Sequence, residues 1–351
     1  MAIKLFLSYA LCLSAASSLA ACSERQLPSV LTSSHADSVA TLQRTPVGRS
    51  MILANSWMSP EAKAVKKLLY VSDYDTGNVY VFSYGTGSLL GALSGVNGPQ
   101  GQCVDARGNV WITALGSVVE YAHGQIWPTK TLTTNGYGSG CSVSRDGDLA
   151  VANSAPESGS GPGDVQVWRH ATGSPLTYYS NECPAPAPPG YDDDGNLYFQ
   201  SVVYDGPQLV CLLPRGAKHI RQVSFDRRID AAGSIQWDGK QLALTDSDYK
   251  QKKVTAIYRV QELRSGDLKL VGRTVLDDSC VNGYENEEYW LFIVGNKNTP
   301  VSREEGQAVV GGNMLCNNRV SYWSYPGGGN PTKSLSAAPT HPQGEAVSIA
   351  P

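Results

Sequence analysis

The stretch Gly101-Gln-Cys-Val-Asp-Ala-Arg-Gly-Asn-Val-Trp-Ile112 decides the fold. It predicts a strand, a tight turn and a second strand, because Gly108 can take a positive φ in the turn and the residues after Asn109 are β-branched or aromatic. Similar stretches occupy residues 141–151, 191–199 and 235–244. The turn glycines are 39, 48 and 44 residues apart: Gly108, Gly147, Gly195 and Gly239. This spacing is typical of one four-stranded blade per repeat.

The last residues of the chain indicate how the blades close into a ring. Pro342-Gln-Gly-Glu-Ala-Val-Ser-Ile349 resembles Pro99-Gln-Gly-Gln-Cys-Val-Asp105, so it predicts a first strand with no strands after it. The first repeat begins instead at what should be its second strand, near Leu68. Joining the two ends completes a ring of six blades and leaves no open sheet edge at the seam. We therefore predict an all-β fold, a six-bladed β-propeller closed by a C-terminal strand that completes blade one.

The same residues carry a resemblance to a known family. The pattern Pro-x-Gly…Asp-x-x-Gly-Asn-Val-Trp-Ile of residues 99–112 resembles six-bladed propellers of the NHL-repeat and SMP-30/gluconolactonase-like superfamily, including bacterial lipoproteins of unassigned activity. The resemblance covers about residues 67–351 and implies a fold rather than a function, because propellers host unrelated tasks. Streptogramin-lyase-like propellers have a similar Gly-Asn-Val-Trp phrase, but the histidine pattern of their metal site has no clear match here.

The first 21 residues have the features of a lipoprotein signal peptide. Lys4 supplies a short positive region, and residues 5–19 are apolar but too few to span a membrane. Leu19-Ala-Ala-Cys22 resembles the lipobox of bacterial lipoproteins, in which the thiol of Cys22 receives a diacylglyceryl group and the protein carries fatty acyl chains such as palmitate. An ordinary secretory signal that is cut nearby is the alternative. Several acyl chains would make the membrane anchoring stable.

These features predict three segments: a signal peptide at residues 1–21, a lipidated Cys22 with a flexible tether at 22–66, and the propeller at 67–351. The tether is expected to be flexible because it is rich in Ser, Thr and Ala. Ser23 is not Asp, which by resemblance to other lipoproteins favours the outer membrane. We expect a lipid-anchored protein of the bacterial cell envelope that faces the periplasm or the surface.

Cysteine usage fits an exported protein. Cys12 leaves with the signal peptide and Cys22 carries the lipid, so six cysteines remain: Cys103, Cys141, Cys183, Cys211, Cys280 and Cys316. An even number in an exported chain predicts three disulfides. Cys103 and Cys141 hold nearly the same place in consecutive repeats and are paired first, with Cys183–Cys211 and Cys280–Cys316 as the other pairs. A zinc site is not expected, because no Cys-x-x-Cys or nearby histidine completes one.

Composition and loop residues limit the classes of partner that the protein can be expected to bind. The chain has 28 Lys and Arg, 31 Asp and Glu, and no basic run, which argues against nucleic acid as a partner. We expect a monomer without a cofactor. In a propeller, the loops between blades and the loops that join strands two and three lie on one side, which we call the loop face. Its acidic, aromatic and amide residues are the candidate ligand residues: Asp73, Tyr74, Asp75, Asn97, Gln100, Asn153, Tyr204, Asp205, Asp246, Asp248, Tyr249, His341 and Gln343.

Two functions are compatible with this pattern. The first is a non-enzymatic binding or scaffold module that takes a protein, peptide or sugar ligand on the loop face. The second is a metal-dependent hydrolase or lactonase of the SMP-30 type, or a lyase, with its site at the channel mouth. Glu345, Asn153 and Asp246 are conceivable ligands for such a metal, and no catalytic residue is assigned. Several acids in the channel would favour the enzyme, and an apolar channel would favour the binding module.

Overall fold

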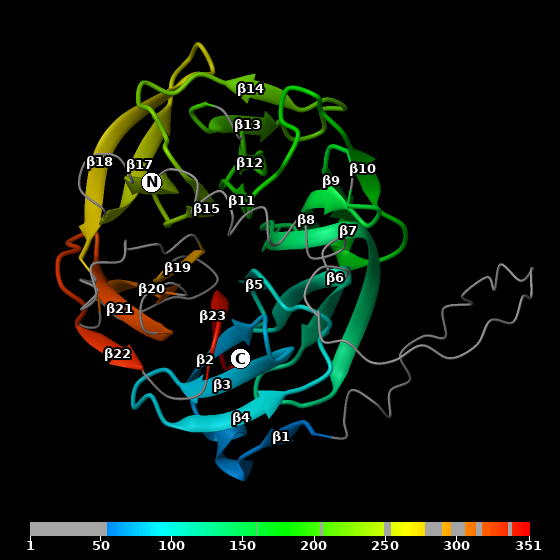
Figure 1. Cartoon of the computed structure of the whole chain (residues 1–351), viewed down its shortest axis with the longest axis vertical. Helices are drawn as coiled ribbons and strands as arrows, with labels where there is room; N and C mark the ends of the chain where they lie inside the picture. Colours follow the sequence, from blue (N-terminus) through cyan, green and yellow to red (C-terminus); the bar gives the residue numbers. More distant parts are fainter. Residues whose placement is uncertain are drawn as a thin grey trace, which may run out of the picture.

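The computed structural model of the chain describes residues 55–351 apart from 160, 204–205, 249–253, 278–289, 296–305, 314–317 and 336–338. Its strands form five antiparallel sheets that surround a central axis (Figure 1). Within the described residues the helices are two short 3-10 turns, η1 (Pro60–Ala64) and η2 (Arg169–Ala171). The predicted all-β propeller is confirmed. None of the helices in the described part is long and apolar enough to cross a bilayer.

The first blade contains both ends of the described chain. From rim to centre its strands are β1 (Trp57–Met58), β4 (Leu89–Leu93), β3 (Asn78–Ser83), β2 (Lys67–Asp73) and β23 (Pro342–Ile349). β23 pairs with β2 in an antiparallel register that runs from Lys67 opposite Ile349 to Asp73 opposite Pro342. The red C-terminal strand therefore lies beside the blue strand in Figure 1. Closure of blade one by the C-terminal strand is confirmed.

The structure has five blades, and the predicted count of six is wrong because repeats two and three share one six-stranded sheet. The strands of this sheet are, in order, β5 (Gln102–Val104), β6 (Val110–Tyr121), β7 (Pro128–Val143), β8 (Leu149–Pro156), β9 (Asp164–Trp168) and β10 (Leu176–Tyr178). β7 is 16 residues long; residues 128–133 and Tyr137 pair with β6, and residues between Gly136 and Val143 pair with β8. The outer strand of the second repeat thus continues into the inner strand of the third.

Glycines inside β7 explain why the strand does not break there. A Cβ at Gly136 would overlap the carbonyl oxygen of Ala155, and a Cβ at Gly140 would lie 2.6 Å from Pro188. These glycines are needed because other chain segments approach the strand closely, which is a use of glycine within strands. The sequence pattern alone favours a turn at such glycines.

The other three blades have four strands each. One contains β11 (Gly190–Tyr191), β12 (Leu197–Ser201), β13 (Leu209–Leu213) and β14 (Arg221–Val223). The next contains β15 (Ala232–Trp237), β16 (Leu242–Asp248), β17 (Val254–Glu262) and β18 (Leu268–Leu276). The last contains β19 (Leu291–Val294), β20 (Gln307–Asn313), β21 (Arg319–Tyr325) and β22 (Lys333–Leu335). β11 is short because the prolines that precede it lack the N–H that a central strand donates.

Buried aromatic residues and disulfides stabilise the sheets. Four aromatic residues lie at or near the ends of β3, β6, β9 and β21, and each is at most 1% exposed: Phe82, Tyr121, Trp168 and Trp323. The predicted pairs Cys103–Cys141 and Cys183–Cys211 are confirmed, and the first joins β5 to β7 with 5.5 Å between the Cα atoms. Cys280 and Cys316 lie outside the described residues, so their pairing stays a prediction.

Residues 55–66, which the sequence assigns to the tether, pack on blade one. β1 pairs with β4 at the rim, and the backbone N–H of Ser94 donates to Ser56 Oγ at 2.8 Å. His123 lies under the entering chain, with Nε2 2.8 Å from the carbonyl oxygen of Val65 and Nδ1 2.7 Å from Ser348 Oγ. Residues 1–54, which include the predicted signal peptide and Cys22, lie outside the described residues.

The contact that closes the ring can be tested with two matched glycines. Gly108 and Gly147 hold the same turn position in repeats two and three, with φ of +79° and +86°. A Cβ at Gly108 would overlap the carbonyl oxygen of Ile349, whereas a Cβ at Gly147 would meet nothing within 4 Å. Both alanine variants incur the cost of a left-handed conformation, about 1–2 kcal/mol. We expect Gly108→Ala to lower the melting temperature more than Gly147→Ala in thermal unfolding followed by circular dichroism. Equal losses would contradict the closing contact.

Candidate functional site

Three predicted ligand residues meet on the loop face where β23 joins blade one. Tyr74 and Asp75 follow β2, and His341 precedes β23, so the register of these two strands brings them together. His341 Nδ1 lies 3.1 Å from Asp75 Oδ1, and the side chains of His341 and Asp75 are 29% and 59% exposed. The His341 ring meets the Tyr74 ring edge to face, with 6.1 Å between the centroids. We call Tyr74, Asp75 and His341 the seam cluster.

A buried carboxylate holds the two chain segments of the seam cluster in place. Asp73 is fully buried and accepts hydrogen bonds from the backbone N–H of Thr340 at 2.7 Å and of Thr76 at 3.3 Å. The hydroxyl of Thr340 also donates to this carboxylate at 3.1 Å. Gln343, another predicted residue, is buried beneath, with Nε2 3.4 Å from His341 Nε2. Asp73 and Gln343 therefore position the cluster rather than face a ligand.

Two predicted residues are buried inside their own blades. Asn153 donates through Nδ2 to Asp164 Oδ1 at 2.6 Å and to Gln166 Oε1 at 3.0 Å. Asp246 accepts from the backbone N–H groups of Asp230 and Ala231 at 2.9 and 3.1 Å. Burial raises the pKa of Asp246 to about 6. The Asp246 carboxyl group and Asn153 Nδ2 bond to nearby residues, and neither side chain reaches the seam cluster.

The remaining predicted residues are dispersed. Asn97 is exposed and Gln100 is half-buried, and both lie in the segment that leads into β5. Tyr204, Asp205 and Tyr249 lie outside the described residues, as does the side chain of Asp248.

The described residues do not gather a metal site. Across these ranges, no three His, Cys, Asp or Glu side chains lie close enough to hold a metal ion together. The conceivable ligands Glu345, Asn153 and Asp246 belong to β23, β8 and β16, which lie in three different blades.

A cavity of about 110 Å³ in the central channel was not predicted from the sequence. Its wall comes from the inner strands and includes Val143, Ile235, Phe292 and the Cys103–Cys141 disulfide. Its rim lies at the turns between first and second strands and contains three charged residues: Arg145, Asp192 and Asp193. We call this side of the molecule the turn face; it lies opposite the loop face, because first strands run from one face to the other.

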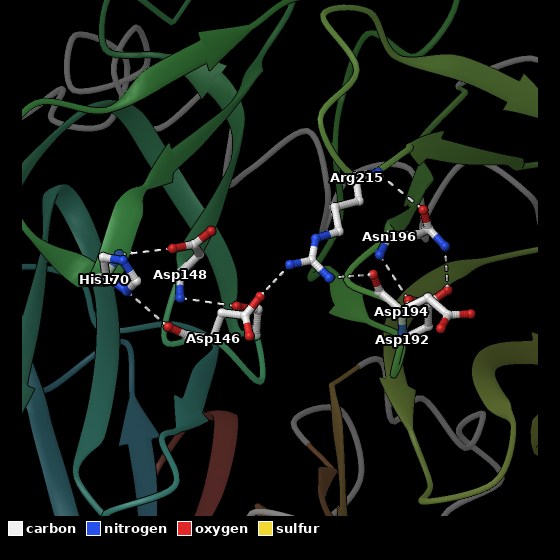
Figure 2. A network of polar contacts seen from close by, with 8 residues as sticks. Asp146, Asp148, His170, Asp192, Asp194, Asn196 and Arg215 are labelled. Atoms are coloured by element: carbon white, nitrogen blue, oxygen red, sulfur yellow. Dashed lines mark hydrogen bonds and ion pairs between the residues drawn. The ribbon is translucent and has the colours of Figure 1, made fainter.

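Next to this rim, Arg215 connects the turns of two neighbouring blades (Figure 2). Its Nη2 lies 2.6 Å from Asp146 Oδ2, and its backbone N–H donates to Asn196 Oδ1 at 3.0 Å. Asp192 Oδ1 accepts the backbone N–H groups of Asp194 and Asn196, which fixes the turn. The Arg215–Asp146 pair is exposed, so solvent screens it and its contribution to stability is small. The network sets the geometry of the turns beside the cavity.

Comparisons with known proteins show the fold alone. No protein-family model and no curated protein matches the sequence. Among solved structures, a Bacteroides caccae protein of unknown function has a TM-score of 0.53 at 10% identity, over 81% of this chain and 99% of that chain. Kuenenia stuttgartiensis hydrazine synthase has a TM-score of 0.51 at 15% identity, over 77% of this chain and 75% of that chain. The β-propeller domain of Myceliophteria thermophila Cps50 (Swd1) has a TM-score of 0.48 at 11% identity, over 83% and 88% of the two chains. The resemblance to NHL-repeat and SMP-30-like propellers stays a prediction.

One buried acid lies in the closing strand. Glu345 of β23 faces Val71 across the ladder and is 4% exposed. In the part of the chain that the structure describes, neither of its carboxyl oxygens has a hydrogen-bond partner. Burial raises the pKa of Glu345 well above its usual value of 4.5. Desolvation thus favours the neutral acid in the folded state.

This acid predicts how stability depends on pH. Because the pKa is higher in the folded than in the unfolded chain, the unfolded chain loses the proton first, and stability falls as pH rises above about 4.5. We expect Glu345→Gln to raise the melting temperature at pH 8 by about 2 °C or more and to make little difference at pH 4. Glu61 of η1 is exposed and provides a matched control, because Glu61→Gln removes no buried group and should change the melting temperature little. A lower melting temperature for Glu345→Gln at pH 8 would contradict the burial of an unpaired acid.

Proposed function

We propose that this protein is a lipid-anchored, extracytoplasmic binding module that takes a sugar ligand on its loop face. The observation that carries the proposal is the seam cluster, where a carboxylate, an imidazole and an aromatic ring converge on one surface. The propeller provides a rigid frame for such a site, because the residues come from the ends of two paired strands. The metal-dependent hydrolase alternative gains no support from the described residues.

The chemistry of the cluster fits a polyhydroxylated ligand. The exposed carboxylate of Asp75 can accept hydrogen bonds from two neighbouring hydroxyl groups. The imidazole of His341 lies 3.1 Å from this carboxylate and helps to hold it in place. The Tyr74 ring offers an apolar surface for the C–H groups of a sugar. A Cβ at Gly98 would lie 3.3 Å from the Tyr74 ring, so this glycine lets the backbone pack against the ring and hold it.

The position of the entering chain is compatible with an anchored module. β1 is the outermost strand of blade one, so the chain before it joins the domain at the rim rather than at the seam cluster. A chain that comes from a lipidated Cys22 would then enter the domain away from the seam cluster.

The anchor is tested by membrane fractionation of cells that express the full chain. We expect Cys22→Ala to move the protein from the membrane to the soluble fraction, because the acylated thiol is lost. Cys12→Ala is the matched control and should stay at the membrane, since Cys12 belongs to the cleaved segment. A Cys22→Ala protein that remains wholly membrane-bound would contradict the anchor.

The ligand class is tested on a glycan array with the full chain carrying Cys22→Ala, followed by calorimetry with any sugar that binds. We expect Asp75→Asn to weaken that binding at least about tenfold, the scale of one lost charge-assisted hydrogen bond. Asp146→Asn on the turn face is the control and should bind normally. Absence of binding to any glycan, or unchanged affinity in Asp75→Asn, would overturn the proposal.

A further inference from the structure

The cavity on the turn face has features that the sugar site does not use. Its volume of about 110 Å³ is several times the 10–15 Å³ or so that one water molecule requires, so it has room for a small organic molecule. About half of its surface is apolar, with Val143, Ile235, Pro188 and Phe292 among the lining residues. A ligand that enters would therefore bury an apolar part.

The rim of the cavity carries both signs of charge. Arg145 is exposed on the turn that precedes β8, and no described residue pairs with its guanidinium. Asp192 and Asp193 lie on the rim from the neighbouring blade. A simple anion would meet two carboxylates, and a simple cation would meet the arginine. A ligand with one charge of each sign can satisfy both.

Two buried polar atoms of residues that line the cavity have no hydrogen-bond partner among the described residues. Gln102 is 8% exposed, and its Oε1 accepts no hydrogen bond in the described part of the chain. Trp237 Nε1 is likewise buried and donates to no described atom. Leaving a buried donor and a buried acceptor unsatisfied is unfavourable, so a polar ligand nearby would be stabilised by them.

We infer that the cavity on the turn face binds a small zwitterion, a free α-amino acid with an apolar side chain. The guanidinium of Arg145 binds the ligand carboxylate, the negative charge of Asp192 and Asp193 attracts its ammonium group, and the apolar part of the wall takes its side chain. This site is separate from the seam cluster, because the two lie at opposite ends of the inner strands.

The test uses the full chain with Cys22→Ala and three probes: L-leucine, its analogue without the amino group (4-methylpentanoate) and its analogue without the carboxylate (3-methylbutylamine). We expect L-leucine to raise the melting temperature by a few degrees at a concentration about 100 times its dissociation constant, and the two analogues to have little effect. Calorimetry should give one L-leucine site per chain. No shift with L-leucine, or an equal shift with either analogue, would overturn the inference.

Single substitutions test whether L-leucine binds in this cavity, and they distinguish the cavity from the proposed sugar site. Arg145→Gln should weaken L-leucine binding at least about tenfold, as expected for loss of a charge-assisted hydrogen bond. Arg107→Gln, an exposed arginine in the turn of the preceding repeat that does not line the cavity, should bind normally. Asp75→Asn should also bind L-leucine normally, so failure of the sugar site and failure of this site are distinguishable. Unchanged binding in Arg145→Gln, with unliganded stability like that of the parent chain, would refute this location.

Discussion

The pairing of β23 with β2 brings the two ends of the propeller together, and the ring depends on it. The closing strand also contacts blade two, because Ser348 Oγ donates to the carbonyl oxygen of Gly108 and Gln102 Nε2 donates to that of Gly344 at 3.1 Å. These bonds join residues 240 and 242 positions apart in the sequence. Contacts of such high sequence separation have a large loop-closure cost, which is typical of propeller-like topologies that fold slowly.

Repetition made much of the fold predictable. The turn at Gly108 recurs along the chain, and the likeness of the last residues to residues 99–105 was enough to predict the closing strand. The same alignment placed Cys103 beside Cys141. The blade count was wrong because β7 runs without a break from the second repeat into the third, so the two repeats share one sheet. The buried position of His123 depends on Ser348, which is 225 residues away.

The candidate site was predictable only where it depends on the register of the closing strand. Tyr74, Asp75 and His341 could be placed together because they flank β2 and β23. Asn153 and Asp246 lie within β8 and β16, where Asn153 Nδ2 and the Asp246 carboxyl group bond to neighbouring residues. Nothing in the local sequence distinguishes such a residue from one that faces solvent. The cavity had no sequence signal, since its wall consists of ordinary core residues from several inner strands.

The strand shared by repeats two and three affects how the propeller can deform. These two repeats are joined by the continuous β7 and by the Cys103–Cys141 bond, so they form one stiff arc of the ring. Rotation of one repeat against the other would have to bend a strand and strain a covalent bond. We therefore expect motions that widen the central channel to occur at the boundaries between separate sheets. We also expect the wall that carries the Cys103–Cys141 disulfide to move less than the walls contributed by β15 and β19.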